Sequence, residues 1–120
     1  MENHKLVLPE HLNQYGYLFG GNLLKWVDEY AWIAATLDYP GCNFVTIGLD
    51  KVEFRKSVRE GAILKFIAEK TRAGKTSVQY FVRVFQGNSQ GSAQELIFST
   101  RVTYVRIDEE GRKTDIPKEE

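Results

Sequence analysis

The chain has few of the residues on which several classes of protein depend. Its 120 residues include one cysteine, Cys42, and two histidines. One thiol cannot form an internal disulfide, and without a matching Cys/His cluster it makes neither a zinc site nor a redox pair. A lone cysteine of this kind is more often structural or simply tolerated than functional. We therefore expect no metal and no cofactor.

An excess of charge of one sign and long apolar runs are also missing. Lys and Arg number 16, Asp and Glu number 16, and the formal net charge is zero. A neutral chain gives little electrostatic reason to expect nucleic acid or an anionic membrane as a partner. No run of about 18 consecutive apolar residues occurs, and no basic segment followed by an apolar one opens the chain. We expect a cytoplasmic protein, or one from an organelle matrix whose targeting segment lies outside this sequence.

What the chain does contain is the composition of one globular domain. Hydrophobic residues make up 42% and charged residues 27%. A chain of this length supports one core and not two, so we expect a single domain over residues 1–120. Its last part, from about residue 109 to 120, is charged and poor in apolar residues, which predicts a turn and then a frayed tail.

One segment shows the spacing of a helix. From Gly20 to about Leu37, apolar residues recur at helical spacing, and Pro40 and Gly41 end the pattern. On a helical wheel the apolar residues cover well over half of the circumference. This predicts a long helix wrapped by other structure, with Asp28 at the border of its narrow polar arc.

The remainder of the chain reads as strands. Four segments with strand character follow the helix, at residues 44–54, 62–72, 75–86 and 93–108. A change of phase near Asp50 and Lys51 predicts a bulge in the first of them. Ala73 and Gly74 predict a tight turn, and "GNSQGS" predicts another. A short apolar run at residues 6–8 is a candidate for an additional edge strand.

One long helix followed by four antiparallel strands with short connections is an α+β layout. A sheet that curls around the helix is the simplest way to bury it. Such a small sheet keeps open edges and leaves part of the helix uncovered. We therefore expect a homodimer.

Three features near the start of the helix are candidates for chemistry. Asp28 is either a solvated carboxylate or one at the mouth of an apolar cleft, where partial desolvation favours a general base or nucleophile. Gly20 and Gly21 leave backbone N–H groups open to an anion or a developing oxyanion, although glycine also permits tight packing. Asn13 either orients a water or carbonyl, or is a plain turn residue.

These residues resemble a known signature. The run "LPEHLNQYGYLFGGNLLKWVDEYA" is similar to that of the hotdog-fold acyl-CoA thioesterases, with an Asn, then a Gly, then Phe-Gly-Gly, and an Asp in the central helix. The similarity continues in "VTIGLDKVEFRKSV", "TRAGKTSVQYFVRV" and "TYVRIDEEGRKTDIP", so it covers nearly the whole chain. The resemblance implies a hotdog fold, dimers with a continuous sheet, and often a hexamer built as a trimer of dimers. It also implies a hydrolase that cleaves acyl-CoA to a free acid and coenzyme A.

The resemblance assigns roles to individual residues. Asn13 and Asp28 match the catalytic pair of the family, with Asn13 of one subunit expected to face Asp28 of the other. The backbone of Gly20 and Gly21 would polarise the thioester carbonyl, and Asp28 would activate water or attack directly. Thr46 matches a threonine that often lines the same cleft.

The segment "RAGKTS" matches the loop that commonly contacts coenzyme A. Arg72 and Lys75 suit the phosphates, Gly74 lies between them, and Thr76 and Ser77 offer hydroxyl donors. The alternative is an ordinary hairpin turn.

Two departures from the family pattern lie elsewhere, and they concern substrate fit more than catalysis. Many relatives have Pro at the position of Ser57, and Gly-Asp at the position of Gly61 and Ala62.

Two alternative functions share the same fold. A non-catalytic acyl-CoA-binding or sensing module would bind its ligand without hydrolysis, and an intact Asp28 counts against it. A hotdog-fold hydratase or dehydratase needs a histidine as acid/base partner. Neither His4 nor His11 has the spacing to supply one.

Overall fold

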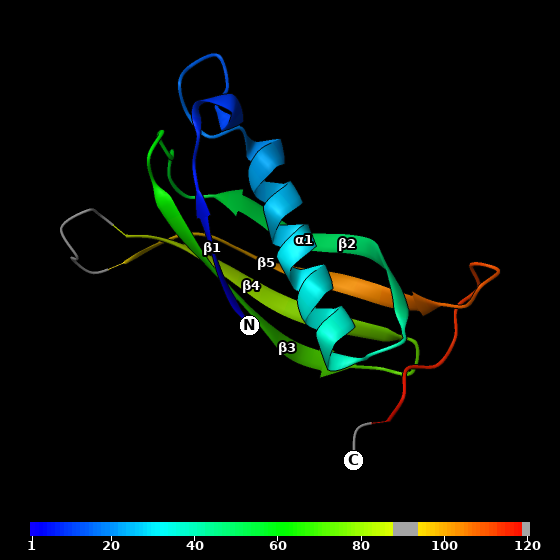
Figure 1. The fold of residues 1–120 in the computed structure, drawn as a ribbon. Helices are drawn as coiled ribbons and strands as arrows, with labels where there is room; N and C mark the ends of the chain where they lie inside the picture. Colours follow the sequence, from blue (N-terminus) through cyan, green and yellow to red (C-terminus); the bar gives the residue numbers. More distant parts are fainter. Residues whose placement is uncertain (88–93, 119–120) are drawn as a thin grey trace.

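The computed structural model describes residues 1–87 and 94–118, and the described residues form one long helix and five strands (Figure 1). The elements in chain order are β1 (Glu2–Leu6), a short 3₁₀ helix (Pro9–His11), α1 (Gly20–Asp38), β2 (Asn43–Phe54), β3 (Ile63–Ala73), β4 (Ser77–Gly87) and β5 (Glu95–Ile107). The predicted α+β architecture is therefore confirmed. No helix within the described ranges is long and apolar enough to cross a membrane.

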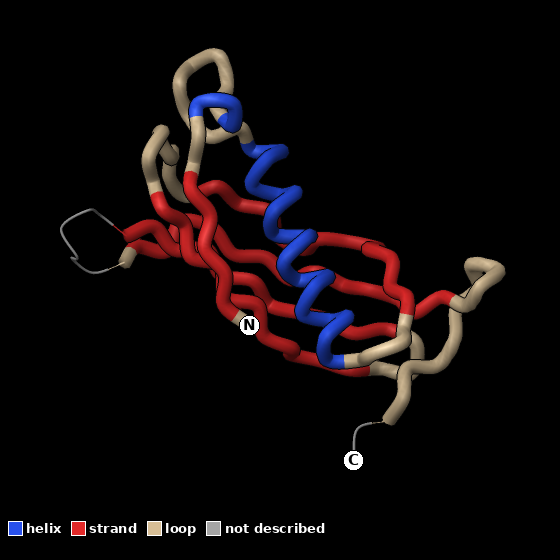
Figure 2. The backbone as a smooth tube through the Cα atoms, in the orientation of Figure 1, coloured by secondary structure: helices blue, strands red, loops and turns tan. Residues whose placement is uncertain are grey.

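All five strands form one antiparallel sheet in the order β1-β3-β4-β5-β2 (Figure 2). From residue 77 to 84 of β4, every second side chain is buried and the alternate ones are partly exposed. The helix crosses the face that carries the buried side chains. The predicted bulge in β2 is confirmed, since the pairing with β5 shifts between Asp50 and Glu53 and Lys51 has a φ of 54°.

The helix buries one side against the sheet. Its buried residues recur three and four apart, and they are Leu23, Trp26, Val27, Ala31, Ala34 and Ala35. The opposite side stays open within one chain, where Lys25 and Glu29 are exposed and Trp32 is 41% exposed. The helix begins after Phe19, which offers no side-chain cap, and it ends where the N–H of Tyr39 donates to the carbonyl of Ala35.

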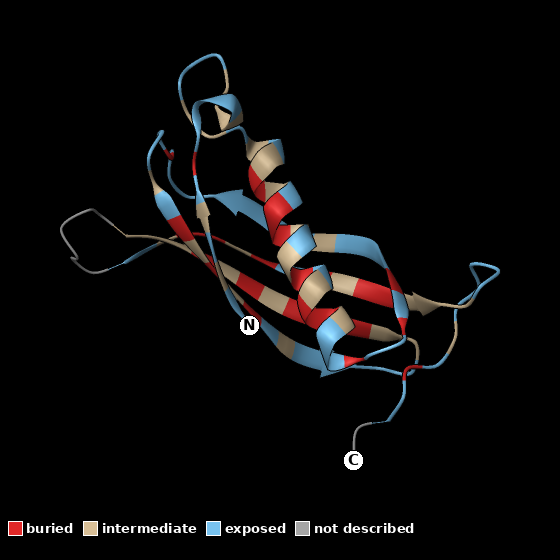
Figure 3. Ribbon diagram, viewed as in Figure 1, coloured by how far each residue is buried: buried red, intermediate tan, exposed pale blue. Residues whose placement is uncertain are grey.

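Strand β2 is one of the two edges of the sheet, and β1 is the other. Nearly all residues of β2 are exposed, including Ile47 at 60% and Phe54 at 51% (Figure 3). A long apolar edge strand with unpaired backbone groups is a template for pairing with another chain. The open side of α1 and the open edge of β2 both leave room for a second copy.

Two parts of the chain differ from their prediction. The edge strand β1 is Glu2–Leu6 rather than residues 6–8, because Val7 leaves the ladder with β3 and is buried in the core. The tail is not frayed up to Ile116, which is 7% exposed and whose N–H donates to the carbonyl of Lys75 at 2.8 Å. The Thr114 N–H also donates to the carbonyl of Arg106 at 3.0 Å, so the segment is docked by backbone bonds as well as by one apolar side chain. The rest of the predicted turn "GNSQGS" after Gly87, and residue 93, lie outside the described residues.

Candidate active site

Asp28 lies in the middle of α1 with its side chain partly buried. Two hydroxyl groups converge on its Oδ1 atom: Thr46 Oγ1 donates from β2 at 2.8 Å, and the Tyr104 hydroxyl lies 2.9 Å away on β5. The same Tyr104 hydroxyl is 2.8 Å from the backbone oxygen of Asp28. No residue in the described part of the chain donates a hydrogen bond to Oδ2. The sheet thus fixes one carboxylate oxygen and leaves the other unengaged.

Tyr104 is a residue of this cluster that the sequence reasoning missed. Its side chain is fully buried in the core under α1. Burial raises the pKa of the Tyr104 hydroxyl well above its usual value, and the Asp28 carboxylate raises it further. The hydroxyl therefore stays protonated and can donate at any pH near neutrality. The signal in the sequence was slight: a tyrosine at a position facing the core, where a buried hydroxyl usually finds a partner.

The carboxylate of Asp28 borders a shallow hollow of about 290 Å³. Lys25, Glu29, Trp32 and Thr46 complete its lining. The Trp32 ring is held there because its Nε1–H donates to the carbonyl of Phe44 at 3.1 Å. A group that enters this hollow can reach Asp28 without any rearrangement of the core.

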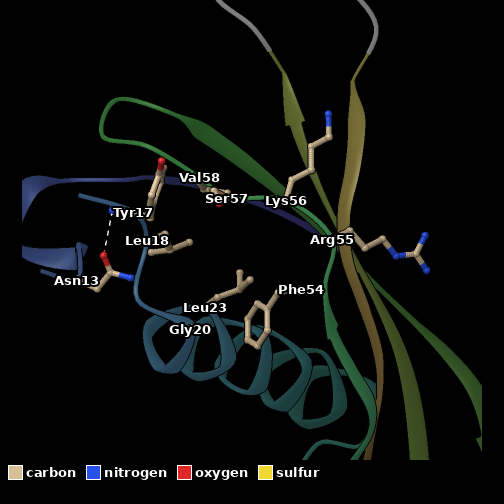
Figure 4. Close-up of a pocket in the computed structure, with 10 residues that line it drawn as sticks. All are labelled: Asn13, Tyr17, Leu18, Gly20, Leu23, Phe54, Arg55, Lys56, Ser57 and Val58. Atoms are coloured by element: carbon tan, nitrogen blue, oxygen red, sulfur yellow. Dashed lines mark hydrogen bonds between the residues drawn. The ribbon is translucent and has the colours of Figure 1, made fainter. Parts of the chain in front are cut away.

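Asn13 holds the loop that precedes the helix. Its Oδ1 accepts the backbone N–H of Tyr15 at 2.9 Å and that of Tyr17 at 3.1 Å. Its own N–H donates to the carbonyl of Tyr17 at 2.7 Å. The side-chain oxygen is therefore used within the loop, as expected of a turn residue. The Nδ2 amide has no acceptor among the described residues, and Figure 4 shows it directed away from the Tyr17 backbone.

A second hollow, of about 390 Å³, lies between this loop, the start of α1 and the end of β2 (Figure 4). Asn13 and Gly20 line it together with the apolar side chains of Leu18, Leu23, Phe54 and Val58. The side chains of Arg55 and Lys56 at its border extend away from Leu18 and Leu23 in the close-up. The hollow thus has a mixed lining, in which the Asn13 amide and the helix N-terminus lie beside apolar side chains.

The glycine pair at the helix start has a packing role. A Cβ on Gly20 would lie 3.0 Å from the Phe54 ring, and one on Gly21 would lie 3.0 Å from the Phe19 ring. The first-turn N–H groups of Gly20 and Gly21 meet no acceptor within the described chain. The glycine pair therefore fits both the packing role and the anion-binding role. Glycine lets the two rings approach the backbone, and it leaves two amide N–H groups open at the positive end of the helix.

The segment "RAGKTS" forms the β3–β4 hairpin. The Gly74 N–H donates to the carbonyl of Ser77 at 2.8 Å, and the carbonyl of Thr76 accepts the N–H of Arg106 at 2.9 Å. The side chains of Arg72 and Lys75 are exposed. This hairpin lies at the C-terminal end of α1, where Gly74, Lys75, Tyr39 and the tail border a third hollow of about 670 Å³.

A single chain holds the predicted site residues in three separate places. Thr46 and Asp28 line one hollow and are hydrogen-bonded to each other. Asn13 and Gly20 line a second hollow, and Gly21 is next to Gly20 in the chain. Residues 72–77 lie at the far end of the helix, by the third hollow. The three hollows share no lining residue. Within residues 1–87 and 94–118, no group of three or more His, Cys, Asp or Glu side chains is placed to hold a metal ion.

Known proteins resemble this chain along most of its length. The model of the thioesterase superfamily matches residues 15–93. An uncharacterized acyl-CoA thioester hydrolase of Bacillus subtilis is 28% identical over 112 residues, a match that spans 93% of this chain and 64% of that protein. The chain thus covers somewhat less than two thirds of this relative.

Two solved structures show the likeness of the fold. An acyl-CoA hydrolase from Staphylococcus aureus, in complex with butyryl coenzyme A and coenzyme A, has a TM-score of 0.89 and 29% identity over 98% of this chain and 71% of its own. A hexameric hotdog-fold thioesterase of Campylobacter jejuni has a TM-score of 0.84 and 32% identity over 96% of this chain and 88% of its own. These similarities confirm the predicted hotdog fold.

Proposed function

The chain belongs to the thioesterase superfamily, and from this premise we propose that it hydrolyses acyl-CoA thioesters to a free carboxylic acid and coenzyme A. The observation that carries the proposal is the carboxylate of Asp28, which two hydroxyls hold at the border of an open hollow. A non-catalytic acyl-CoA-binding module would have no need of a carboxylate fixed in this way.

The Staphylococcus hydrolase supports the choice of residues. Its solved variants replace an asparagine, an aspartate or a threonine by alanine. That asparagine and aspartate are separated by the same number of residues as Asn13 and Asp28, and the threonine follows at a spacing that differs from Thr46 by one residue. The same three residue types, in the same order, border the first two hollows here.

We place the working site between two copies of the chain. Asn13 and Asp28 border different hollows of one chain, so one copy does not bring them together. Pairing of β2 with its counterpart would extend the sheet across a homodimer and let Asn13 of one subunit face Asp28 of the other. Assembly of such dimers into a trimer of dimers is proposed by analogy with the hexameric Campylobacter relative.

The chemistry follows from these positions. Asp28 Oδ2 takes a proton from water while the water oxygen bonds to the thioester carbonyl carbon. The Asn13 amide and the backbone N–H groups of Gly20 and Gly21 stabilise the resulting oxyanion. The C–S bond then breaks, and the coenzyme A thiolate takes up the proton. In the alternative route Oδ2 attacks the carbonyl carbon and the C–S bond breaks, which releases coenzyme A as a thiolate and leaves a mixed anhydride on Asp28. Water then hydrolyses the anhydride to the free acid and restores the Asp28 carboxylate, and the thiolate takes up the proton that is released.

The β3–β4 hairpin supplies the contacts for coenzyme A in this proposal. Arg72 and Lys75 carry exposed positive charges for its phosphates. The turn at Gly74, with the hydroxyls of Thr76 and Ser77, presents further donors on the same hairpin.

The test is thiol release from a series of acyl-CoAs of increasing chain length. Asp28→Asn keeps the shape of the side chain and removes its charge, and we expect hydrolysis to fall by on the order of 10³-fold or more. Asp38→Asn, at the end of the same helix, is the matched control and should retain wild-type rates. A wild-type protein that binds acyl-CoA but hydrolyses none of the series would overturn the proposal in favour of the binding module.

A further inference from the structure

We infer that Tyr104 is a positioning residue for Asp28: with Thr46 it holds Oδ1, so that Oδ2 is the oxygen that acts on the substrate. The inference rests on the proposed hydrolysis and adds to it a residue and an atom. Tyr104 does not meet the substrate, because its side chain is fully buried and lines none of the three hollows.

The two hydroxyls reach one oxygen because of the strand register. Thr46 on β2 and Tyr104 on β5 are direct partners across the sheet, so their side chains emerge side by side. The register shifts between Thr46 and Gly48, immediately beyond this pair. A bulge of this kind changes the direction of the strand beside a site. The pair is thus aimed at the middle of α1, where Asp28 lies.

The two donors differ in how firmly they are held. Tyr104 is on β5, which has β4 on one side and β2 on the other, and its ring lies 6.4 Å from each of the Tyr80 and Phe44 rings between centroids. Thr46 is exposed on the edge strand. The phenol is therefore the fixed reference for the carboxylate. Its single O–H proton is shared between Oδ1 and the backbone oxygen of Asp28, which ties the helix to the same point.

The chain contains a matched pair for comparison. Tyr80, on the neighbouring strand β4, is also buried, and its hydroxyl donates to Asp38 Oδ2 at 2.6 Å. Burial raises the pKa of the Tyr80 hydroxyl as it does for Tyr104, so both remain donors near neutral pH. Asp38 is exposed and borders none of the three hollows. Removing either hydroxyl breaks one tyrosine–aspartate bond to α1, but only one of the bonds orients Asp28.

The experiment compares Tyr104→Phe with Tyr80→Phe in the chain of 120 residues, using the acyl-CoA that the wild type cleaves fastest. Loss of the Tyr104 hydroxyl should lower kcat by about 10- to 100-fold and leave KM unchanged, because a hydrogen bond to a charged group is lost. Tyr80→Phe should leave kcat and KM unchanged. Both variants should lower the Tm by similar amounts, since each loses one hydrogen bond that a buried hydroxyl donates to α1.

A second readout does not depend on turnover. In protein labelled with ¹³C at aspartate carboxyl carbons, the Asp28 resonance at neutral pH should move in Tyr104→Phe and stay in place in Tyr80→Phe. If Tyr104→Phe does not fold, Thr46→Val removes the other donor to Oδ1 and should move the same resonance and lower kcat.

The inference would be overturned by equal effects of the two tyrosine variants on kcat, or by an Asp28 resonance that does not move in Tyr104→Phe. Neither outcome would affect the proposed hydrolysis, which the loss of activity in Asp28→Asn would still support. A wild type without hydrolysis would overturn the proposed function instead. The carboxyl resonance would then still decide whether Tyr104 orients Asp28.

Discussion

The two halves of the proposed site are built in opposite ways. Asp28 is held by the hydroxyls of Thr46 and Tyr104, which lie 18 and 76 residues further along the chain. Asn13 is held by backbone N–H groups two and four residues away, in its own loop. One half therefore depends on the register of the sheet, and the other depends on local turn chemistry. A change in one half should leave the geometry of the other intact, while activity needs both.

Among the changes that affect only one half of the site, we expect the largest fall in kcat at Asn13. Asn13→Ala removes the Nδ2 donor and also the oxygen that holds the loop, and kcat should fall by about 10²- to 10³-fold, as for the loss of an oxyanion donor. Asn13→Asp keeps the oxygen that accepts the N–H groups of Tyr15 and Tyr17, but it loses the donor. Thiol-release kinetics of both variants check this. An Asn13→Asp protein with wild-type kcat would mean that Asn13 serves only to order the loop.

A smaller effect, on stability and not on kcat, is expected where the tail docks, because Ile116 lies outside both halves of the proposed site. Ile116→Ala removes a nearly buried apolar side chain, and the free energy of unfolding should fall by about 2 kcal/mol, at the lower end for such a change in a core. Chemical denaturation measures this, with Pro117→Ala on the exposed side of the tail as control. The kcat of Ile116→Ala should stay at the wild-type value. A variant as stable as the wild type would show that the tail contributes nothing to the core.

The smallest effect is expected at the hairpin, which belongs to neither half. Lys75→Ala should raise KM for acyl-CoA by about 2- to 5-fold with kcat unchanged, because an exposed charge contributes about 1 kcal/mol or less. The matched substrate is an acyl-N-acetylcysteamine, a thioester without phosphates, for which KM should not change. An equal rise in KM for both thioesters would contradict a role of Lys75 in phosphate binding.

Local patterns in the sequence were enough for much of the fold. The helix from Gly20, the alternation of the strands and the bulge near Asp50 each depend on residues close together in the chain, and the structure confirms them. The turn role of Asn13 is of the same kind, since its bonds lie within its own loop.

Features set by distant contacts could not be read in this way. The bond between Tyr104 and Asp28 depends on how β5 lies under α1, and the docking of Ile116 depends on the carbonyl of Lys75. The single domain, the cytoplasmic location and the lack of a nucleic-acid or membrane partner stay predictions from the sequence. The roles of Asn13, Asp28 and the hairpin residues stay proposals.

The central claim is that two copies of the chain complete one site, and mixing two inactive variants tests it most directly. Asn13→Ala and Asp28→Asn protein would be unfolded together, refolded and assayed for thiol release beside each variant refolded alone. In a two-fold symmetric dimer, random pairing gives one site in about four that has Asn13 from one variant and Asp28 from the other, so about a quarter of the wild-type rate should return. A mixture that forms heterodimers but is no more active than its parents would contradict a site shared between subunits.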